Sequence, residues 1–502
     1  MDELNKITRL LRDRVKDTYS AIDLDVNETD PSKEQQLLNG IIQGQFDTDD
    51  DAAQGLYGTD GLDQRFRMLK SRLRHRLLNL LYFVDYKDSK TKISTQYEQE
   101  SVNYIHKAKI LLREGLDEIA EKMVNKGLAI SMETELTEVT LEGLGILRKL
   151  QSYHCQPANF FRTLEELEKF RHLLKVEEEA MDLYFKHRML VKKSVNSRKK
   201  SLEDAIEAVN QLEILWEQTK SFNVFEKYYI LKVICHESNG DYDVILKLTE
   251  QTEKLVKQGK INQLRFDERF NVFMKTYSLL RIKQYEKGLK YAEHALTYFE
   301  RSSSNWFAHM ENYFLLAIRN KDYDLAAKLL DQVFRNPHMD KLSARPTQRW
   351  KLLRAYLYHI HPDKHLNEIV NFDQFYLSLT ILNQDKRGFN VALMVLEFLH
   401  YLSRGEKEKL LDKVERLEKY IYRHLNEGDV TYRDKLFFKL LLVIVDTGFD
   451  AKLAQKRGQK LLEKLKVAEE HGDAYAELEV IPYEDLWNHL MMMVVGEHAV
   501  VV

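Results

Sequence analysis

The sequence predicts an all-α protein, a solenoid of helical hairpins preceded by a separate helical module. Proline, the strongest helix breaker, occurs only six times in 502 residues and is absent between Ala158 and Arg335. Glycine is also scarce, whereas Leu, Lys and Glu, which form helices well, are abundant. We therefore expect almost no sheet and a helix content above about two-thirds, where about one-third is usual.

A short phrase repeats in the middle of the chain. Gly240-Asp241-Tyr242, Lys283-Gln284-Tyr285 and Lys321-Asp322-Tyr323 each lie between two amphipathic runs, and their tyrosines are 43 and 38 residues apart. A period of this length is typical of stacked helical hairpins, in which each hairpin buries its apolar face against its neighbours. Such a stack offers a surface for binding other molecules. The repeat therefore indicates a scaffold.

The N-terminal 95 residues have a pattern of their own. Thr48 precedes three aspartates, and a hydroxyl followed by acids in the first turn indicates the start of a helix. Gly58 is the expected stop, because glycine adopts the left-handed conformation that ends many helices. In order, we expect an amphipathic helix within residues 1–23, a loop over 25–32, helices over 34–46 and 49–57, a long amphipathic helix over 61–84 and a polar linker over 85–95.

The remaining residues form pairs of amphipathic runs, with breaks expected at Pro157 and over residues 337–346. The expected helices cover residues 97–113, 116–131, 136–153, 160–192, 201–219, 225–238, 244–257, 266–281, 286–299, 307–319, 325–334, 350–359, 375–382, 391–402, 407–424, 433–445, 451–464 and 485–494. The one expected extended segment, 475–483, is rich in β-branched and aromatic residues. The chain is thus divided into an N-terminal module (1–95), long hairpins (96–220), regular repeats (221–345), degenerate hairpins (346–470) and a C-terminal cap (471–502).

The central repeats resemble the tetratricopeptide repeat family. In that family a Gly-x-Tyr phrase opens the second helix of each hairpin, and small residues follow three and ten positions after the tyrosine. Small residues let two helices approach closely, and the tyrosine fills the gap between hairpins. The corresponding residues of the three repeats are Gly240, Tyr242, Ile245 and Thr252; Tyr285, Gly288 and Ala295; and Tyr323, Ala326 and Val333. The first repeat lacks the small residues, the spacing exceeds the family's ~34 residues, and the Trp-x-x-Leu-Gly signature of the first helix is absent.

A second resemblance concerns the C-terminal part. The stretch Ile481-Pro482-Tyr483-Glu484-Asp485-Leu486-Trp487 is similar to the ending of uncharacterised bacterial helical-repeat proteins. This resemblance implies a bacterial helical-repeat protein and carries no function with it.

Charge, cysteine content and hydropathy narrow the class of protein. The chain has 76 Lys and Arg against 79 Asp and Glu, so no global charge attracts nucleic acid or anionic lipid. Cys155 and Cys235 are too few for a disulfide framework and indicate a reducing compartment. The first 20 residues lack the apolar core of a secretory signal, and no run reaches the ~18 apolar residues that span a bilayer. We expect a soluble, cytoplasmic protein with no membrane partner.

The basic helix over residues 61–84 raises an alternative function. It follows a short helix and a glycine turn, which is the order of a helix-turn-helix motif. Its arginines Arg67, Arg72, Arg74 and Arg76 can meet phosphates, so the alternative is a nucleic-acid-binding regulator whose repeats sense a partner. The opposing interpretation is a solvated helix face whose charges are offset by Asp47, Asp49, Asp50, Asp51 and Asp60. Ion pairing of these arginines within the fold would favour the second interpretation.

Two clusters contain residue types that bind metals. Asp47, Asp49 and Asp51 begin like a calcium loop, but Ala52 and Gly58 stand where that loop needs Gly and Glu. The second cluster lies beside Pro362, as in a turn, and lacks a known ligand spacing; it consists of His359, His361, Asp363 and His365. We expect no metal and no other cofactor.

The sequence also lacks catalytic signatures such as Gly-x-Ser-x-Gly, a phosphate loop or a dinucleotide fingerprint. We therefore expect a non-enzymatic scaffold that binds a protein or peptide. In the tetratricopeptide family the first helices of the hairpins line the inner surface. The resemblance thus implies a groove lined by Phe270, Phe273, Tyr277, Glu311 and Leu315. Aromatic side chains give a large contact area, which suits peptide capture.

Overall fold

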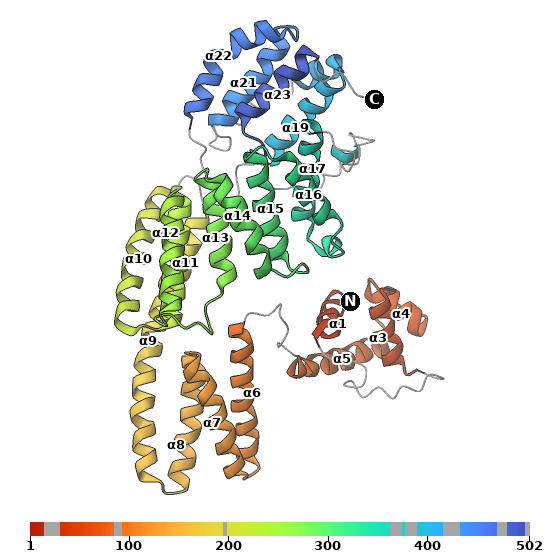
Figure 1. The fold of residues 1–502 in the computed structure, drawn as a ribbon. Coiled ribbons are helices and arrows are strands. Elements are labelled where there is room, and N and C mark those ends of the chain that lie inside the picture. Colours follow the sequence, from red (N-terminus) through yellow and green to blue (C-terminus); the bar gives the residue numbers. More distant parts are fainter. Residues whose placement is uncertain are drawn as a thin grey trace. The chain divides into compact units, whose positions relative to one another are not determined.

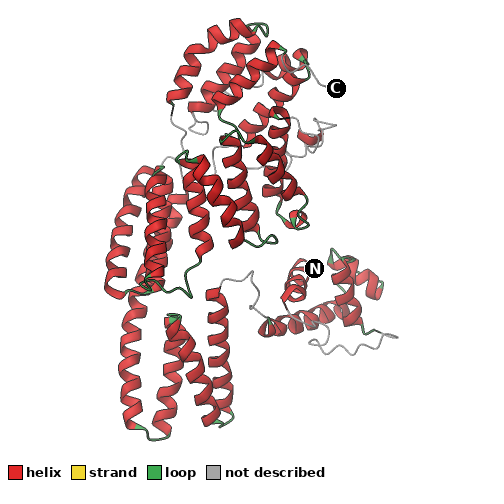
Figure 2. Ribbon diagram, viewed as in Figure 1, coloured by secondary structure: helices red, strands yellow, loops and turns green. Residues whose placement is uncertain are grey.

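The computed structural model describes residues 1–14, 31–84, 93–193, 198–361, 374–376, 389–414, 432–468 and 479–496. Of these residues 83% are helical and none lies in a strand, which confirms the predicted all-α class and helix content (Figure 2). The chain divides into two compact units, Met1–Asn103 and Tyr104–Val502 (Figure 1). The predicted division into five segments is finer than this and stays a prediction.

Several predicted segments fall partly beyond the described ranges. They are the first helix within 1–23, the loop 25–32, the linker 85–95, the helices 375–382 and 407–424, the extended segment 475–483 and the C-terminal cap 471–502.

The first unit is a small helical module with one apolar core. Its helices are α1 (Asp2–Arg14), α3 (Lys33–Gln43), α4 (Asp49–Tyr57) and α5 (Gln64–Asn79), followed by the 3-10 turn η1 (Leu80–Phe83). α5 buries Phe66, Leu69, Leu73 and Leu77, whose spacing places all four on one side of the helix. These side chains pack against apolar residues of the other three helices, so α5 is the central element of this module.

The start of α4 matches the predicted helix cap. The amide of Asp51 donates to the Thr48 hydroxyl at 3.1 Å, and the amide of Thr48 donates to the Asp51 carboxylate at 2.9 Å. Asp49 accepts from the Met1 ammonium and from Lys70, each at 2.6 Å. Burial acts to raise the pKa of Asp49, but these two cations outweigh it and hold the pKa below its usual value. The acids of this turn therefore serve the helix start and local ion pairs.

The second unit begins with four long helices that share one kind of connection. The helices are α6 (Ile93–Arg113), which starts before the unit boundary, α7 (Asp117–Glu133), α8 (Thr137–Tyr153) and α9 (Pro157–Lys193). Gly115, Glu135 and Cys155 each take a left-handed conformation, with φ of 71°, 53° and 51°. In each case the next residue's amide bonds back to a carbonyl five residues earlier, at 2.9, 2.7 and 2.9 Å. This closure satisfies carbonyls that the helix end would leave unpaired.

Two prolines at predicted breaks lie at the starts of helices. α9 begins at Pro157, and Pro346 lies in the first turn of α17 (Ala344–Ile360), which starts before the predicted residue 350. Proline lacks an amide hydrogen, but the first turn of a helix needs none, and its fixed φ is already helical. The α-helices are interrupted over residues 154–156 and 335–343, so the predicted breaks at Pro157 and over 337–346 are present, whereas the predicted helix starts at 160 and 350 are too late.

The predicted repeats are three helical hairpins. Their helices are α11 (Phe222–Asn239) with α12 (Tyr242–Lys257), α13 (Glu268–Arg281) with α14 (Tyr285–Ala295) and the 3-10 turn η2 (Leu296–Tyr298), and α15 (Ser304–Arg319) with α16 (Tyr323–Phe334). Gly240, Lys283 and Lys321 hold the same place in the three turns, with φ of 82°, 63° and 60°. The following amides bond back to the first helix at 2.9, 3.0 and 2.9 Å. The repeated phrase in the sequence thus corresponds to one repeated turn.

The small residues of the repeats lie where helices approach one another. A Cβ atom added to Gly288 of α14 would lie 2.6 Å from a methyl group of Leu316 on α15. Ala295, Ala326 and Val333 are fully buried. Neighbouring helices of this region pack in pairs, and the first helices α13 and α15 also contact each other directly.

A polar junction joins three connections of the second unit. The carboxylate of Glu135, in the turn between α7 and α8, accepts from the amide of Phe222 at 2.6 Å and from Asn262 Nδ2 at 3.0 Å. Arg265 donates to the carbonyl of Glu135 at 3.1 Å and to Asn223 Oδ1 at 2.8 Å. Phe222 begins α11 after α10 (Arg198–Thr219), and Arg265 precedes α13. The junction therefore fixes the starts of α11 and α13 to the α7–α8 turn.

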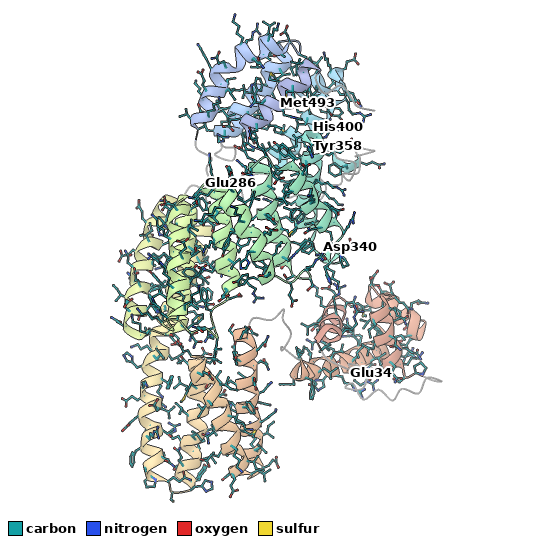
Figure 3. All side chains as sticks on the ribbon, in the orientation of Figure 1. Glu34, Glu286, Asp340, Tyr358, His400 and Met493 are labelled. Atoms are coloured by element: carbon teal, nitrogen blue, oxygen red, sulfur yellow. The ribbon has the colours of Figure 1, made fainter. Side chains whose placement is uncertain are left out.

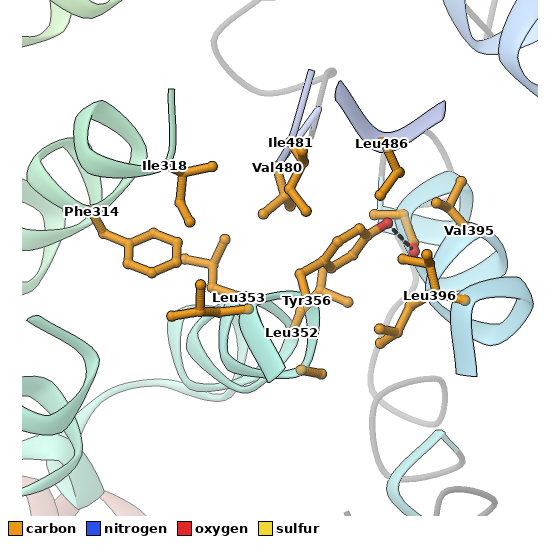
Figure 4. Close-up of a cluster of buried hydrophobic side chains, with 14 of the residues drawn as sticks. Phe314, Ile318, Leu352, Leu353, Tyr356, Val395, Leu396, Val480, Ile481 and Leu486 are labelled. Carbon is orange, nitrogen blue, oxygen red and sulfur yellow. Dashed lines mark hydrogen bonds between the residues drawn. The ribbon is translucent and has the colours of Figure 1, made fainter. Parts of the chain in front are cut away.

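The C-terminal helices share one core with the repeats. These helices are α17, α19 (Phe389–Ser403), α21 (Tyr432–Asp446), α22 (Ala451–Val467) and α23 (Tyr483–Val495). In Figure 4 Phe314 and Ile318 of α15 lie on the same side of the cluster as Leu353 of α17, with Val480 and Ile481 across from them. The Tyr356 hydroxyl donates to the carbonyl of Ala392 at 2.6 Å, which satisfies a phenol that is fully buried.

A buried arginine holds the segment before α23. Arg433 donates to both carboxylate oxygens of Glu479, at 2.6 and 3.1 Å, and to Glu484 at 2.9 Å. Arg319 of α15 donates to the carbonyl of Glu479 at 2.8 Å. These contacts, here called the Arg433 clamp, tie residues 479–484 to α21 and to the last repeat. The described residues 479–482 form no strand, although the sequence predicted an extended segment there.

Replacement of Gly288 by Trp tests whether this position is a helix contact. An indole cannot fit where a single Cβ already meets Leu316, and overpacking costs about 1–3 kcal/mol or more. We expect a clearly lower melting temperature for Gly288→Trp in thermal unfolding followed by circular dichroism. Gly145→Trp on α8 is the matched control, because a Cβ there meets nothing within 4 Å. Equal melting temperatures for the two variants would contradict the packing.

A buried histidine predicts acid sensitivity. His359 of α17 packs edge-on against His400 of α19, with ring centroids 5.5 Å apart, and its carbonyl accepts from His489 (Figure 3 labels His400). Burial, with added repulsion from His400 and His489, lowers the pKa of His359 to about 3. An unfolded histidine has a pKa of about 6.5, so below that pH the unfolded chain binds a proton that the folded chain does not.

The free energy of unfolding should therefore fall as the pH drops from about 6.5 toward about 3, with His359 contributing about 1.4 kcal/mol per pH unit. Above about pH 6.5 the contribution is constant. Urea unfolding over this range should give a shallower pH dependence for His359→Gln, which stays neutral throughout. Parallel curves for the two proteins would mean that folded His359 takes up its proton at an ordinary pH.

Candidate functional site

A pocket of about 420 Å³ lies between α13, α15 and the start of α17, and is here called the central groove. Glu237 at the end of α11 and Glu479 of the Arg433 clamp also line it. The α15 residues that line it recur at helical spacing and so share one face; they are Ser304, Phe307, Ala308, Glu311, Asn312, Leu315 and Arg319. The groove is thus built by first helices of successive hairpins.

Aromatic side chains form the apolar part of the central groove. Phe273 and Tyr277 of α13 stack with ring centroids 6.4 Å apart, and both are only partly buried. Phe307 of α15 and Trp350 of α17 are almost fully buried and present the deeper part of the lining. Burial raises the pKa of Tyr277, so its hydroxyl stays protonated across the physiological range. These residues offer a firm apolar surface to a side chain of a ligand.

The charged lining contains four arginines and three glutamates. Arg281, Arg319, Arg345 and Arg349 line the groove together with Glu237, Glu311 and Glu479. Arg349 forms an ion pair with Glu311. The carboxylate of Glu479 forms an ion pair with Arg433, which does not line the groove. Arg281 also lies over the ring of Tyr242, 4.9 Å from its centroid.

A buried amide lies among these groups. Asn312 lines the groove, is only 6% exposed, and its Nδ2 has no hydrogen-bond partner among the described residues. Buried amides are nearly always hydrogen-bonded, and an unfilled donor costs about 1–3 kcal/mol. This donor is therefore open to a bound group or a water molecule that would complete it.

Four of the five residues predicted to bind a partner come together in this groove. Phe273, Tyr277, Glu311 and Leu315 all line it. Phe270 does not; it lies one turn earlier on α13, edge-on to Tyr229 at 6.0 Å. Phe270 is about one turn before Phe273 and two turns before Tyr277, and it does not line the pocket. Whether any of the five residues binds a partner stays a prediction.

Four charged residues of the lining were not predicted from the sequence: Arg345 and Arg349 of α17, Glu237 and Glu479. Arg345 lies within the predicted break 337–346, and Arg349 lies just before the predicted helix 350–359, so the prediction places neither on a helix face. The signal was present, since Ser343 followed by Pro346 is typical of a helix start, where proline fits the first turn. Glu237 and Glu479 carry no local signal, because they reach the groove only through tertiary packing.

The basic helix of the first unit is largely ion-paired. Arg74 pairs with Glu3 at 2.8 Å and Arg76 with Glu34 at 3.4 Å, while Lys70 binds Asp49. Arg67 and Arg72 are exposed on the same helix. Of the four arginines named for nucleic acid, two thus belong to contacts that hold α1 and α3 against α5.

The two cysteines and the histidine cluster do not form a reactive or metal-binding site among the described residues. Cys235 is buried, and burial raises its pKa to about 11, whereas Cys155 is exposed. His361 contacts Asp324 at 3.0 Å, and Asp363 and His365 lie outside the described residues. No group of three or more His, Cys, Asp or Glu able to hold a metal occurs among the residues that the structure describes.

In the same ranges, no helix combines the length and apolar character that crossing a bilayer requires.

Comparison of the chain with protein-family models, with curated proteins and with solved structures finds no match. The resemblance to tetratricopeptide repeats is therefore based only on the residues around Tyr242, Tyr285 and Tyr323 and on the turns that precede these tyrosines.

We expect little affinity of the basic helix for DNA at physiological salt, because Arg74, Arg76 and Lys70 already hold carboxylates. Fluorescence anisotropy with duplex and single-stranded oligonucleotides measures this. If the helix does bind phosphates, replacing Arg72, Arg74 and Arg76 by Gln should reduce the salt dependence by about three contacts, each worth a slope of about 0.9. A sub-micromolar, salt-sensitive affinity that disappears in the triple variant would favour the nucleic-acid regulator.

Proposed function

We propose that this chain is a non-enzymatic, cytoplasmic scaffold that binds a segment of a partner protein in the central groove. In this proposal the helical pairs continue as a solenoid of tetratricopeptide-like hairpins, and the first helices present the binding face. The observation that carries the proposal is the lining itself, which combines aromatic rings, guanidinium groups and a buried amide with an unfilled donor.

This combination suits a polypeptide ligand. Trp, Tyr and Arg are the residues that contribute most to protein–protein binding energy, and they do so from well-packed pockets. The groove volume of about 420 Å³ lies within the range of ligand pockets, about 300–1,000 Å³. An extended segment can place one side chain against Phe307 and Trp350 while its main chain reaches Asn312.

Blocking the groove tests the proposal. Ala308 is exposed, lines the groove and lies on α15, so Ala308→Trp should fill the binding space without disturbing the core. Asn305→Trp is the matched control, since Asn305 is exposed on the same helix and does not line the groove. Both variants should keep the circular dichroism spectrum and the melting temperature of the native chain.

A random dodecapeptide library displayed on phage supplies the probe, with the full-length protein as bait. We expect selected peptides to bind Ala308→Trp at least about tenfold more weakly than the native chain, a loss of about 1.4 kcal/mol, and to bind Asn305→Trp unchanged. Failure to obtain any peptide whose binding depends on Ala308 would refute the proposed function.

A further inference from the structure

We propose that the contact between α17, α19 and α23, here called the histidine latch, opens on acidification and releases α23 while the rest of the chain stays folded. One histidine from each of the three helices meets there, namely His359, His400 and His489. The opening is a property of the fold, so it does not depend on whether the central groove binds a partner. Its consequence is that the apolar side of α23 and the surface beneath it become accessible in acid.

The ring of His359 has little access to water. It is only 6% exposed, and its Nε2 atom has no hydrogen-bond partner among the described residues. Its Nδ1 atom lies 3.5 Å from the hydroxyl of Ser403 on α19, and that hydroxyl donates to the carbonyl of His400 at 2.8 Å. A proton added to this ring would create a buried charge, which proteins avoid unless a partner compensates it.

Two more histidines approach His359 from the neighbouring helices. The ring centroid of His400 lies 5.5 Å from that of His359, and the Nε2–H group of His489 donates to the carbonyl of His359 at 2.9 Å. Burial, together with repulsion from these two histidines, lowers the pKa of His359 to about 3. The three helices thus meet through groups that repel one another once they are protonated.

The carboxylates on the elements around the latch already have basic partners at 2.7 to 3.0 Å. The pairs are Asp485 of α23 with Lys321, Glu397 of α19 with Lys413, and Asp324 of α16 with His361. Two phenols also lie here, Tyr358 beside His359 and Tyr401 beside His400, and a phenol is neutral in acid. A carboxylate that moved to compensate a charged His359 would have to leave its present partner.

α23 is the helix that can move away at the least cost. α19 buries every residue from Val391 to Leu402, whereas α23 buries only five of its 13 residues. Met492 and Val495, beyond His489 on α23, are exposed, so the part of the helix that follows the latch covers little apolar surface. Segments with few buried apolar contacts open locally at a lower free energy than the core does.

Hydrogen exchange of the full-length chain, measured by mass spectrometry at pH 7 and pH 5, tests the latch. When α23 opens, His359 reaches water and takes up a proton below about pH 6.5, so acid favours the open form. After correction for the intrinsic exchange rates, we expect the protection of residues 483–495 to fall at least about tenfold between the two pH values. Residues 242–257 of α12 belong to another hydrophobic cluster and should lose less than about threefold.

A neutral replacement of His359 shows whether this residue causes the response. His359→Gln cannot take up a proton, so the protection of α23 should change less than about threefold between pH 7 and pH 5. His172→Gln, at an exposed position of α9, is the matched control and should keep the native response. Circular dichroism at pH 7 checks the fold of each variant. His359→Asn, which is also neutral, takes the place of Gln if the longer side chain lowers the melting temperature.

Three results would overturn the latch. Protection that falls equally in α23 and α12 would mean that the whole chain loses stability together, without a local opening. A response of α23 that persists in the neutral His359 variant would assign it to other groups. Equal protection of α23 at pH 7 and pH 5 would mean that the helix stays closed over a neutral His359. None of these results bears on peptide binding by the central groove.

Discussion

The position of the central groove depends on the polar junction at Glu135. This residue lies in a left-handed turn, and its carboxylate and carbonyl accept from the amide of Phe222 and from Asn262 and Arg265. Local sequence preference does not favour a left-handed glutamate, and the strain of such a conformation is about 1–2 kcal/mol. The hydrogen bonds from two other connections compensate for it. The starts of α11 and α13 are thereby fixed, and α13 is one wall of the groove.

The apolar packing of α13 explains why the groove walls are firm. Phe273 and Tyr277 contact two hydrophobic clusters, one formed by α9–α13 and one that continues through α15 and α17 to α23. A side chain shared by two clusters is held from both sides, so it loses little further freedom when a ligand binds. Binding then loses less free energy to the ordering of side chains, which is the usual reason why pre-formed sites bind tightly.

The helices could be predicted from the sequence, and the groove only in part. The predicted 136–153 and 225–238, for example, correspond to α8 and α11, because amphipathic spacing and turn residues are local signals. The face of α13 and α15 followed from the resemblance, which placed Phe273 and Leu315 on the inner side. The α17 wall was not predicted, because Pro346 was assigned to a break. Glu479 is brought to the groove by Arg433, and no local pattern in the sequence indicates such a distant ion pair.

The Arg433 clamp also has a consequence for the order in which the chain acquires its shape. Glu237 and Glu479 line one pocket, although almost half of the chain lies between them. During synthesis, domains generally fold from the N-terminal side, and contacts between distant residues form late because long loops must close. α13 and α15 can pair while the ribosome is still adding later residues, but the wall that contains Glu479 cannot. The complete groove can therefore form only after residue 479 has been synthesised, and until then α15 has an uncovered apolar side that invites aggregation.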